Sequence, residues 1–363
     1  MKSTTVRPGV RLLLTLLCDL LALGVCLVVF ALFHHVLPDH IDPQILDQDS
    51  ASVIDRPSGD ADETPEARAD RLTEACKRYK SSPFPARTVS ILPGYDGDGE
   101  QIRLRKVEYG TGSQKVTYYA ADIFVDSVSK IHASVATKNG DLTTDYVYAQ
   151  ALEKHALFAV SGDYFKNSEV GLAIRDGVLY RNVTTKNDVC LLNMDGSLEI
   201  LEGYDETQLG TLGRRVWQSW SFGPSLLTKD GAVKTKNKQF NVHSTGGTFH
   251  NTNEESENGV YAKNPRCFIG CVEPGHYLLV VVDGRDEGYS CGVTFLEESQ
   301  LAYDEGCEVA YNLDGGRSAM MVYRLLPTDD PTKMVNESYK DGRPISDIIY
   351  LLKLDKPDDP SDE

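Results

Sequence analysis

The chain has 363 residues, 41% hydrophobic and 25% charged, and a formal net charge of −17 at pH 7. This charge argues against a nucleic-acid partner, because phosphate backbones are bound by basic surfaces. It also disfavours nonspecific adhesion to anionic lipid, although it allows a local basic pocket inside an acidic protein.

The N-terminal segment predicts a single transmembrane helix. Residues 12–33 form an apolar run interrupted by few polar side chains, of which Asp19 is the costliest. About 20 apolar residues span a bilayer, and no small-residue cleavage site follows Phe33. We therefore expect an uncleaved signal anchor over residues 12–33.

The basic residues around this run predict its orientation. Lys2, Arg7 and Arg11 precede it, and the next Lys or Arg is Arg56. The positive-inside rule places residues 1–11 in the cytoplasm and the rest outside. The expected localisation is the cell membrane, single-pass, with an extracellular C-terminal domain.

Residues 34–86 predict an acidic stalk. Between residues 38 and 70 the chain is rich in Asp, Glu and Pro and contains no aromatic residue, which is typical of flexible segments. One short amphipathic helix is expected over Glu66–Lys80.

Residues 87–357 predict one globular domain, followed by an acidic disordered tail at 358–363. The pattern indicates the α+β class: a strand-rich mixed-sheet domain with few helices. Lys234–Asn264 is polar and predicts a long mobile loop. The expected strands are Gln101–Tyr109, Val116–Ile131 and an edge strand over Ile345–Leu352, with hairpins over Gly171–Tyr180, Val189–Ile200 and Arg266–Val282.

Two apolar runs near the C-terminus each end in an Asp-Gly turn. Tyr277–Val282 stops at Asp283-Gly284-Arg285, and Glu308–Leu313 stops at Asp314-Gly315-Gly316-Arg317. Both runs are typical of buried strands. Asp-Gly alone is common turn chemistry. The repetition at corresponding strand ends, with an arginine nearby each time, favours a site.

The segment between these strands predicts a helix. Thr294 and Glu297 have the spacing of a capping box, and Gly306 suits the position after the helix C-cap. The resulting strand–helix–strand unit predicts parallel strands with a right-handed crossover. Both aspartates would then leave the sheet at strand carboxyl ends, where such sheets bind ligands.

Five motifs in this order resemble the phosphodiester glycosidase family over about residues 100–352. They are Ser161-Gly162-Asp163-Tyr164-Phe165, Trp217–Pro224, Asn264-Pro265-Arg266, Asp283-Gly284-Arg285 and Asn312-Leu313-Asp314-Gly315-Gly316. Two positions depart from the family pattern. Arg317 stands where relatives usually have a third glycine, and Ser161 where they commonly have Asn. Bacterial members are often labelled exopolysaccharide biosynthesis proteins.

The resemblance implies hydrolysis of a sugar-1-phosphodiester in glycan or cell-surface polysaccharide metabolism. A phosphate monoester leaves readily without a proton, so the main needs are an activated water or nucleophile and stabilisation of an oxocarbenium-like centre. The expected catalytic residues are Asp314 and Asp283, with Asp163 third. The expected substrate-binding residues are Arg266, Arg285, Asn312, Arg317, Gly315 and Gly316.

Two other functions fit the same residues. The protein could be a non-catalytic glycan-binding protein of the cell envelope, or a glycan-phosphate transferase in which an acceptor hydroxyl replaces water. Structural alternatives also exist: Asp163 as a turn cap, Arg266 as a bridge to Asp283, and Glu297 as a helix cap only.

The cysteines do not predict a metal site. Six of the eight lie outside the apolar run, so disulfides are possible in several pairings. Cys267 and Cys271 are expected in one strand, where they would be too far apart for one disulfide or metal ion. We expect no cofactor, with a Ca²⁺ or Mg²⁺ ion at the Asp-rich strand ends left open.

Overall fold

The computed structural model divides the chain into two units, residues 1–40 and 41–363. The helix expected over residues 66–80, Cys76 and the tail at 358–363 lie outside the residues that the structure describes. Those residues are 8–31, 39–40, 43–54, 81–139, 141–164, 166, 168–234, 241–244, 247–250, 262–323, 335–337 and 342–352.

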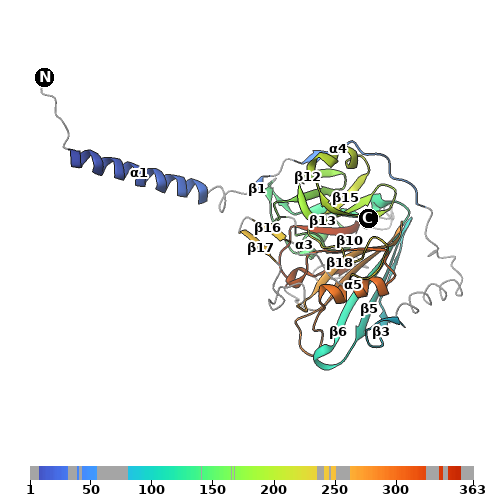
Figure 1. The fold of residues 1–363 in the computed structure, drawn as a ribbon. Helices are drawn as coiled ribbons and strands as arrows, with labels where there is room; N and C mark the ends of the chain where they lie inside the picture. Colours follow the sequence, from blue (N-terminus) through green and yellow to red (C-terminus); the bar gives the residue numbers. More distant parts are fainter. Residues whose placement is uncertain are drawn as a thin grey trace, which may run out of the picture. The chain divides into compact units, whose positions relative to one another are not determined.

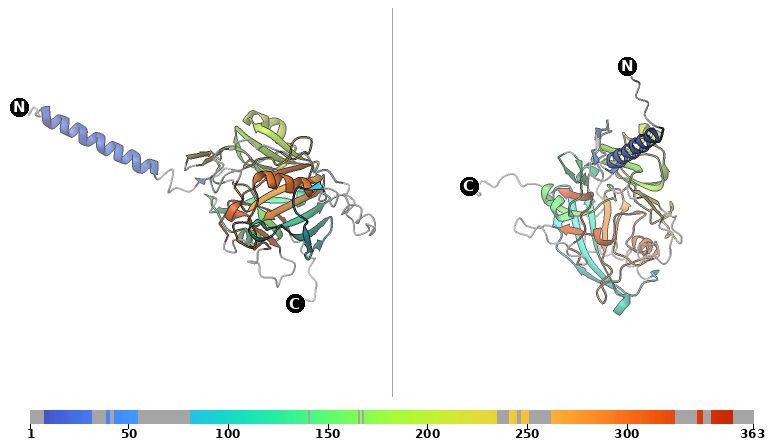
Figure 2. Two further views of the ribbon diagram at one scale, coloured as in Figure 1. Left: turned by 60° about the horizontal axis from the view of Figure 1, so that its bottom comes forward. Right: turned by 90° about the vertical axis from the view of Figure 1, so that its left-hand side faces the viewer.

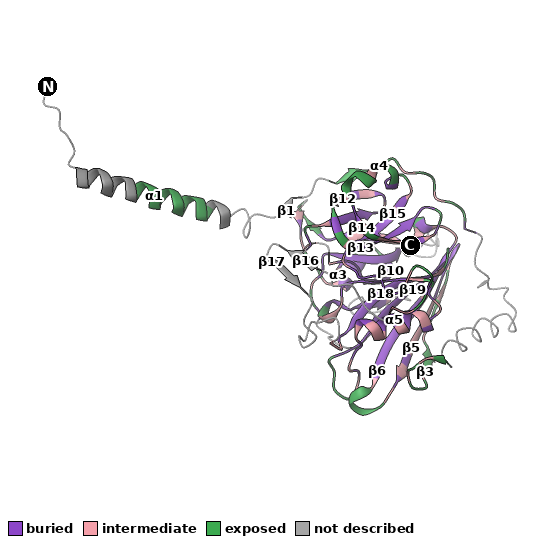
Figure 3. Ribbon diagram, in the orientation of Figure 1, coloured by how far each residue is buried: buried purple, intermediate pink, exposed green. Residues whose placement is uncertain are grey.

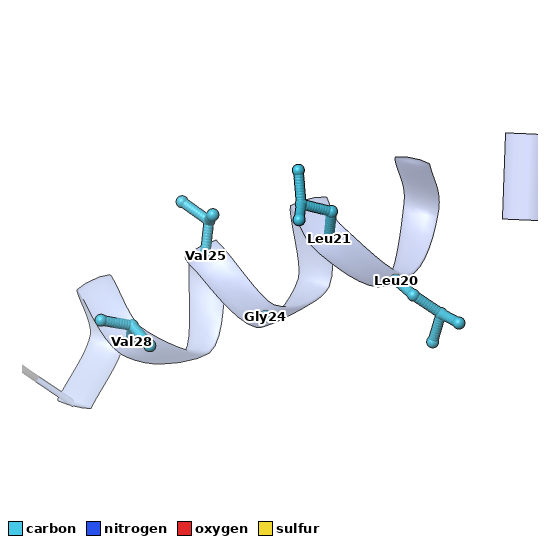
Figure 4. Close-up of a pocket in the computed structure, with 5 residues that line it drawn as sticks. All are labelled: Leu20, Leu21, Gly24, Val25 and Val28. Carbon is cyan, nitrogen blue, oxygen red and sulfur yellow. The ribbon is translucent and has the colours of Figure 1, made fainter. Parts of the chain in front are cut away.

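The first unit contains the helix α1, Pro8–Ala31, and the short strand β1, Asp39–His40. Proline suits the first turn of a helix, because the N–H groups of that turn have no intrahelical acceptor and proline therefore loses no hydrogen bond there. The leucines and valines described on α1 are all more than half exposed. Figure 4 shows Leu20, Leu21, Val25 and Val28 projecting from the helix around Gly24. Within the described part of the chain, no helix combines the length and apolar character that a membrane crossing requires.

The largest sheet of the second unit has seven strands and carries the C-terminal motifs. Its order is β20-β18-β19-β6-β5-β3, with β4 also paired to β5, and all of these pairs are antiparallel. The bounds are β3 Thr88–Ile91, β4 Tyr95–Asp96, β5 Glu100–Tyr109, β6 Val116–Val125, β18 Arg266–Glu273, β19 His276–Val282 and β20 Val309–Asn312.

The expected strand–helix–strand unit is present. β19 and β20 are both antiparallel to β18, so they run parallel to each other with β18 between them. The helix α5, Phe295–Asp304, begins with the predicted capping box of Thr294 and Glu297. Gly306 follows with φ +94°, a conformation that favours glycine after a helix end. Figure 1 shows α5 against this sheet.

Two smaller sheets complete the fold. The order β21-β10-β22-β7 makes a four-stranded sheet, and β14-β13-β15-β11-β12-β2 makes a six-stranded one. The bounds are β2 Gln44–Ile45, β7 His132–Val135, β10 Ala156–Ser161, β11 Gly171–Arg175, β12 Val178–Val183, β13 Thr185–Asn193, β14 Leu198–Tyr204, β15 Val216–Trp220, β21 Met321–Tyr323 and β22 Asp347–Leu352.

Short elements connect these sheets. β8 and β9 form a small hairpin, and β16 and β17 form another inside the segment expected to be a long loop. The bounds are α3 Val147–Glu153, α4 Leu209–Leu212, β8 Thr137–Lys138, β9 Asp141–Leu142, β16 Asn241–Ser244 and β17 Gly247–His250. The structure confirms a strand-rich α+β domain with few helices.

Three expectations about strands need correction. β22 is not an edge strand, because it pairs with β10 on one side and β7 on the other, and Ile348 and Ile349 are buried on its two faces. The strand from Val116 ends at Val125 because Ser127 begins a 3₁₀ turn by accepting a hydrogen bond from Ser129 N. The hairpin around Asp176-Gly177 extends further than predicted, to Val183.

Alternating side chains bury both faces of the seven-stranded sheet. In β19, Leu278 and Val280 pack with α5, whereas Leu279 and Val281 face the core shared with β10, β13 and β22. Figure 3 shows the strands mainly as buried ribbon, and Figure 2 gives two further views of the same layers.

Residues 43–54, which fall within the expected acidic stalk, instead pack on the domain. β2 pairs with β12, Ser52 N donates to Met194 O at 3.0 Å, and Ile54 is 9% exposed in the main core. This docking uses main-chain hydrogen bonds and one apolar anchor, neither of which acidic composition reveals.

Candidate functional site

The three C-terminal motifs meet at Pro265. β18 begins beside it, between the ends of β19 and β20. A Cβ atom on Gly284 would lie 2.7 Å from Pro265 N, and one on Gly315 would lie 2.9 Å from Pro265 O. Gly316 N also donates to Pro265 O at 2.9 Å. The Asp-Gly turns therefore need glycine to approach this backbone, and they bring Asp283 and Asp314 to the same edge of the sheet.

A fourth motif joins this edge through the main chain. Asp314 N donates a hydrogen bond of 2.9 Å to Gly162 O, so the turn after β10 lies beside the turn after β20. Ser161, one of the two departures from the family pattern, accepts a hydrogen bond from Met320 N at 3.0 Å and donates to Ser318 O. The Ser161 hydroxyl thus holds the segment that follows Arg317.

Asp314 has a basic partner that the sequence did not indicate. Its two carboxylate oxygens lie 3.3 and 3.2 Å from Nη2 of Arg343, which also donates to Ser318 Oγ at 2.6 Å. Asp314 is 5% exposed. Burial raises its pKa above the ordinary value, while Arg343 and Ser318 act in the opposite direction.

Asp283 lies at the equivalent strand end in a closed environment. It is 0% exposed, and its carboxylate accepts hydrogen bonds of 2.9 Å each from Asn336 Nδ2, Tyr289 OH and Glu337 N. These contacts tie the segment 335–337 to the end of β19. The catalytic role of Asp283 stays a prediction, and its surroundings favour a structural role.

Asp163 connects two segments of the site. Its Oδ1 accepts from Tyr164 N and its Oδ2 from Ser221 N, both at 2.8 Å, and Arg175 Nη2 lies 3.6 Å from Oδ2. The turn-capping alternative therefore fits its contacts. A second buried acid, Asp347, accepts from Arg175 Nε at 2.7 Å. Burial raises the pKa of Asp347 to about 7 against the effect of Arg175.

Arg266 is a buried side chain and not an open phosphate ligand. Its guanidinium lies 3.8 Å from the centre of the Phe295 ring and donates to Val293 O and Ala262 O. Burial lowers its pKa to about 10. The guanidinium therefore packs against Phe295, the first residue of α5.

Arg285 and Asn312 differ in accessibility. Arg285 is exposed, has φ +57°, and donates through Nε to Asn264 Oδ1 at 2.8 Å. A Cβ atom on Gly316 would lie 3.9 Å from Arg285 Nη2. Asn312 is 1% exposed, and its Nδ2 donates to Gly223 O at 2.7 Å. Arg285 is therefore accessible beside the turn, whereas Asn312 fixes the neighbouring backbone.

Arg317 and Arg343 lie on two segments that touch. Both residues are exposed, Arg343 N donates to Arg317 O at 3.0 Å, and Arg317 Nη2 lies 3.5 Å from Gly342 O. Arg343 was missed by sequence reasoning because it stands in a polar stretch without a motif. The one sequence feature that could have indicated Arg343 is its position as a charged residue just before the final apolar strand.

Aromatic side chains lie beside Arg343 and its partner Asp314. The Arg343 guanidinium lies 5.6 Å from the centre of the Tyr164 ring, which lies 5.4 Å from that of Phe222. Trp220 is fully buried, and Trp217 Nε1 donates to Ile131 O at 2.8 Å, so both tryptophans serve the fold. Tyr164 and Phe222 are both partly exposed, and Tyr164 is close enough to Asp314 to be affected by its charge.

The structure gives the two cysteines of β18 a packing role in the main core. Cys267 and Cys271 lie in β18 as predicted, and both are buried and free. Cys18, Cys26, Cys190 and Cys291 are free thiols as well. In that same part, no group of three or more His, Cys, Asp or Glu side chains is placed to hold a metal ion.

Comparison with known proteins supplies the family. The phosphodiester glycosidase family matches residues 154–352. An uncharacterized SPbeta prophage-derived protein of Bacillus subtilis, YomE, is 27% identical over 262 residues, 68% of this chain; the chain spans only 36% of that relative's length.

Two solved structures are similar to this chain, and the zebrafish structure shows the same fold. The catalytic domain of zebrafish N-acetylglucosamine-1-phosphodiester alpha-N-acetylglucosaminidase, auto-inhibited by its pro-peptide, is 18% identical with a TM-score of 0.53, and the match covers 76% of this chain and 93% of that one. A putative exported protein of Burkholderia pseudomallei is 13% identical with a TM-score of 0.45, covering 75% and 98% respectively. By its motifs and the span of the family match, the chain belongs to the phosphodiester glycosidase family.

Proposed function

We propose that the protein hydrolyses a sugar-1-phosphodiester at the anomeric carbon. The family assignment supports a glycosidase-type hydrolase acting on a sugar phosphodiester. The observation that carries the proposal is Asp314, a nearly buried carboxylate at a strand end, in contact with the exposed arginine Arg343. An acid next to exposed cationic groups can act on the sugar carbon while the cations bind the phosphate.

In the proposed reaction the bond between the anomeric carbon and the bridging oxygen breaks. The electron pair stays on the phosphate, and the oxygen of water bonds to the sugar carbon. Asp314 accepts the proton of that water or stabilises the cationic sugar centre. Asp283 and Asp163 are the alternatives, although hydrogen bonds within the protein occupy both of their carboxylates.

Two other functions use the same surface, and one assay separates them. The full chain, in detergent, is incubated with chromogenic sugar-1-phosphodiesters. Turnover in water supports the hydrolase. Turnover only after an acceptor sugar is added supports a glycan-phosphate transferase, and binding without turnover supports a glycan-binding protein of the cell envelope.

We also propose that residues 12–33 anchor the domain to the outer side of the cell membrane. The apolar run and the three basic residues before it support this orientation. The proposed substrate is then a phosphodiester-linked glycan, such as an exopolysaccharide, at the cell surface.

A further inference from the structure

We infer that Arg317 and Arg343 form a two-guanidinium clamp for the phosphate that leaves during the proposed reaction. The inference rests on the proposed function for its chemistry and on the 314–318 turn and the 342–343 segment for its geometry. It assigns a role to one residue that departs from the family pattern and to one that no motif marks.

The two arginines are held differently. Arg343 is anchored, because its Nε and Nη2 both donate to Ser318 Oγ and Nη2 also contacts Asp314. Its side chain is nevertheless 45% exposed. Among the described residues, the Arg317 side chain has only the 3.5 Å contact from Nη2 to Gly342 O and forms no ion pair with a carboxylate. One guanidinium is therefore fixed beside the catalytic candidate, and the second is available to close on a ligand.

The main chain keeps the pair together. The hydrogen bond from Arg343 N to Arg317 O joins the two segments at these residues, and Ser161 fixes the backbone that follows. This hydrogen bond joins the main chains of the two arginines, and an anion that draws their guanidiniums together would offset the repulsion between the two positive charges. Only one carboxylate, Asp314, is paired with either of them in the described part of the chain.

The proposed reaction increases the negative charge of the phosphate group. A phosphodiester carries one negative charge. When the bond to the anomeric carbon breaks, the electron pair remains on the phosphate oxygen, and the monoester product carries two negative charges near neutral pH. Two guanidiniums therefore bind the product-like phosphate more strongly than the substrate, which is the kind of differential binding that raises kcat.

The test is a binding measurement that does not depend on turnover. At pH 8 methyl phosphate is a dianion, because the second pKa of such a monoester is about 6, while dimethyl phosphate is a monoanion. Isothermal titration of the full chain should show tighter binding of methyl phosphate than of dimethyl phosphate. Arg317→Gln should weaken methyl phosphate binding about 10- to 100-fold, as expected for a charged hydrogen bond, and reduce the preference.

A matched control removes another exposed arginine. Arg214 is 57% exposed and pairs with Asp47 and Asp49, so Arg214→Gln should leave both affinities unchanged. Arg343→Lys keeps the positive charge but loses the planar guanidinium that binds an anion through two N–H groups. This variant should retain part of the preference for methyl phosphate over dimethyl phosphate. Equal binding of the two probes by the natural protein, or an unchanged preference in Arg317→Gln, would overturn the clamp.

The two proposals can fail separately. If the clamp binds methyl phosphate but no sugar-1-phosphodiester is hydrolysed, the clamp stands and the proposed reaction fails. If hydrolysis occurs and Arg317→Gln lowers neither kcat nor the affinity for methyl phosphate, the reaction stands and the clamp fails.

Discussion

Asp314 and Asp283 occupy equivalent strand ends but have different surroundings. Asp314 contacts an exposed arginine, whereas the Asp283 carboxylate accepts hydrogen bonds from Tyr289 OH and from two groups of the segment 335–337. The two aspartates can therefore be separated by the same substitution, because Asn is nearly isosteric with Asp and removes its charge.

Asp314→Asn should abolish sugar-phosphodiester hydrolysis while leaving the fold intact. The substitution removes the charge that accepts a proton or stabilises a cationic sugar, which costs about 10²- to 10⁴-fold in rate. Steady-state rates and thermal melting measure the two effects. Full activity with unchanged melting would exclude Asp314 from the mechanism.

Asp283→Asn should instead lower stability. The amide nitrogen of the new side chain would face hydrogen-bond donors where Asp283 presents only acceptors, at a cost of about 1–3 kcal/mol. Chemical denaturation of this variant beside Asp314→Asn measures the difference. If Asp283→Asn keeps its stability and loses activity, Asp283 is the catalytic residue.

The sequence predicted part of this residue-level picture. It predicted that Asp283, Arg285 and Asp314 lie at strand ends on one edge of the sheet, because each follows a short apolar run at a glycine turn; their roles stay predictions. It could not identify Arg343, Asp347 or Asn336, because their role depends on segments that approach only in the folded chain. Asn336 also begins a glycosylation-acceptor pattern, but the structure buries it to 2% exposure and bonds it to Asp283.

At the scale of elements, prediction succeeded where local patterns decide. The capping box of α5, its terminal Gly306 and the hairpin turns at Asp176-Gly177 and Asp195-Gly196 follow from neighbouring residues. The central place of β22 did not follow, because its partners β7 and β10 are distant in sequence.

Helix α5 carries a buried acid that should make stability depend on pH. Glu298 is fully buried, and neither carboxylate oxygen has a hydrogen-bond partner among the described residues. Burial raises its pKa from 4.5 to about 8, against the effect of Arg266. Between these values the folded state keeps a proton that the unfolded chain releases, so the free energy of unfolding falls as pH rises from about 4.5 to 8.

Glu298→Gln should reduce this pH dependence. The variant should gain stability relative to the natural protein as pH rises through the window, by at most about 1.4 kcal/mol per pH unit. Denaturant titrations at pH 5 and pH 8 give the comparison. Glu153→Gln, at a side chain that is 69% exposed, is the control, and identical slopes in all three proteins would contradict the account.

At the scale of the whole molecule, residues 43–54 belong to the packed domain. Ile54 lies in the main core, and β2 extends the six-stranded sheet. Removing residues 1–54 should therefore lower the melting temperature relative to a chain that lacks only residues 1–40. Equal melting of the two truncated chains would show that this segment adds nothing to stability.

The proposed membrane topology has its own test. Protease added to intact cells should cleave the chain within residues 55–80 and produce a fragment that begins there, because this stretch combines acidic and polar composition with few apolar residues. Complete protection, with a known surface protein cleaved in parallel, would contradict an extracellular domain.

The most direct test of the central claim is the position of bond cleavage. The full chain is incubated with N-acetylglucosamine-1-phosphodiesters and related sugar-1-phosphodiesters in ¹⁸O-labelled water, and the released phosphate monoester is examined by ³¹P NMR and mass spectrometry. Attack at the anomeric carbon predicts a phosphate monoester without ¹⁸O, and no release by Asp314→Asn. Incorporation of ¹⁸O into the phosphate would show attack at phosphorus and contradict a glycosidase.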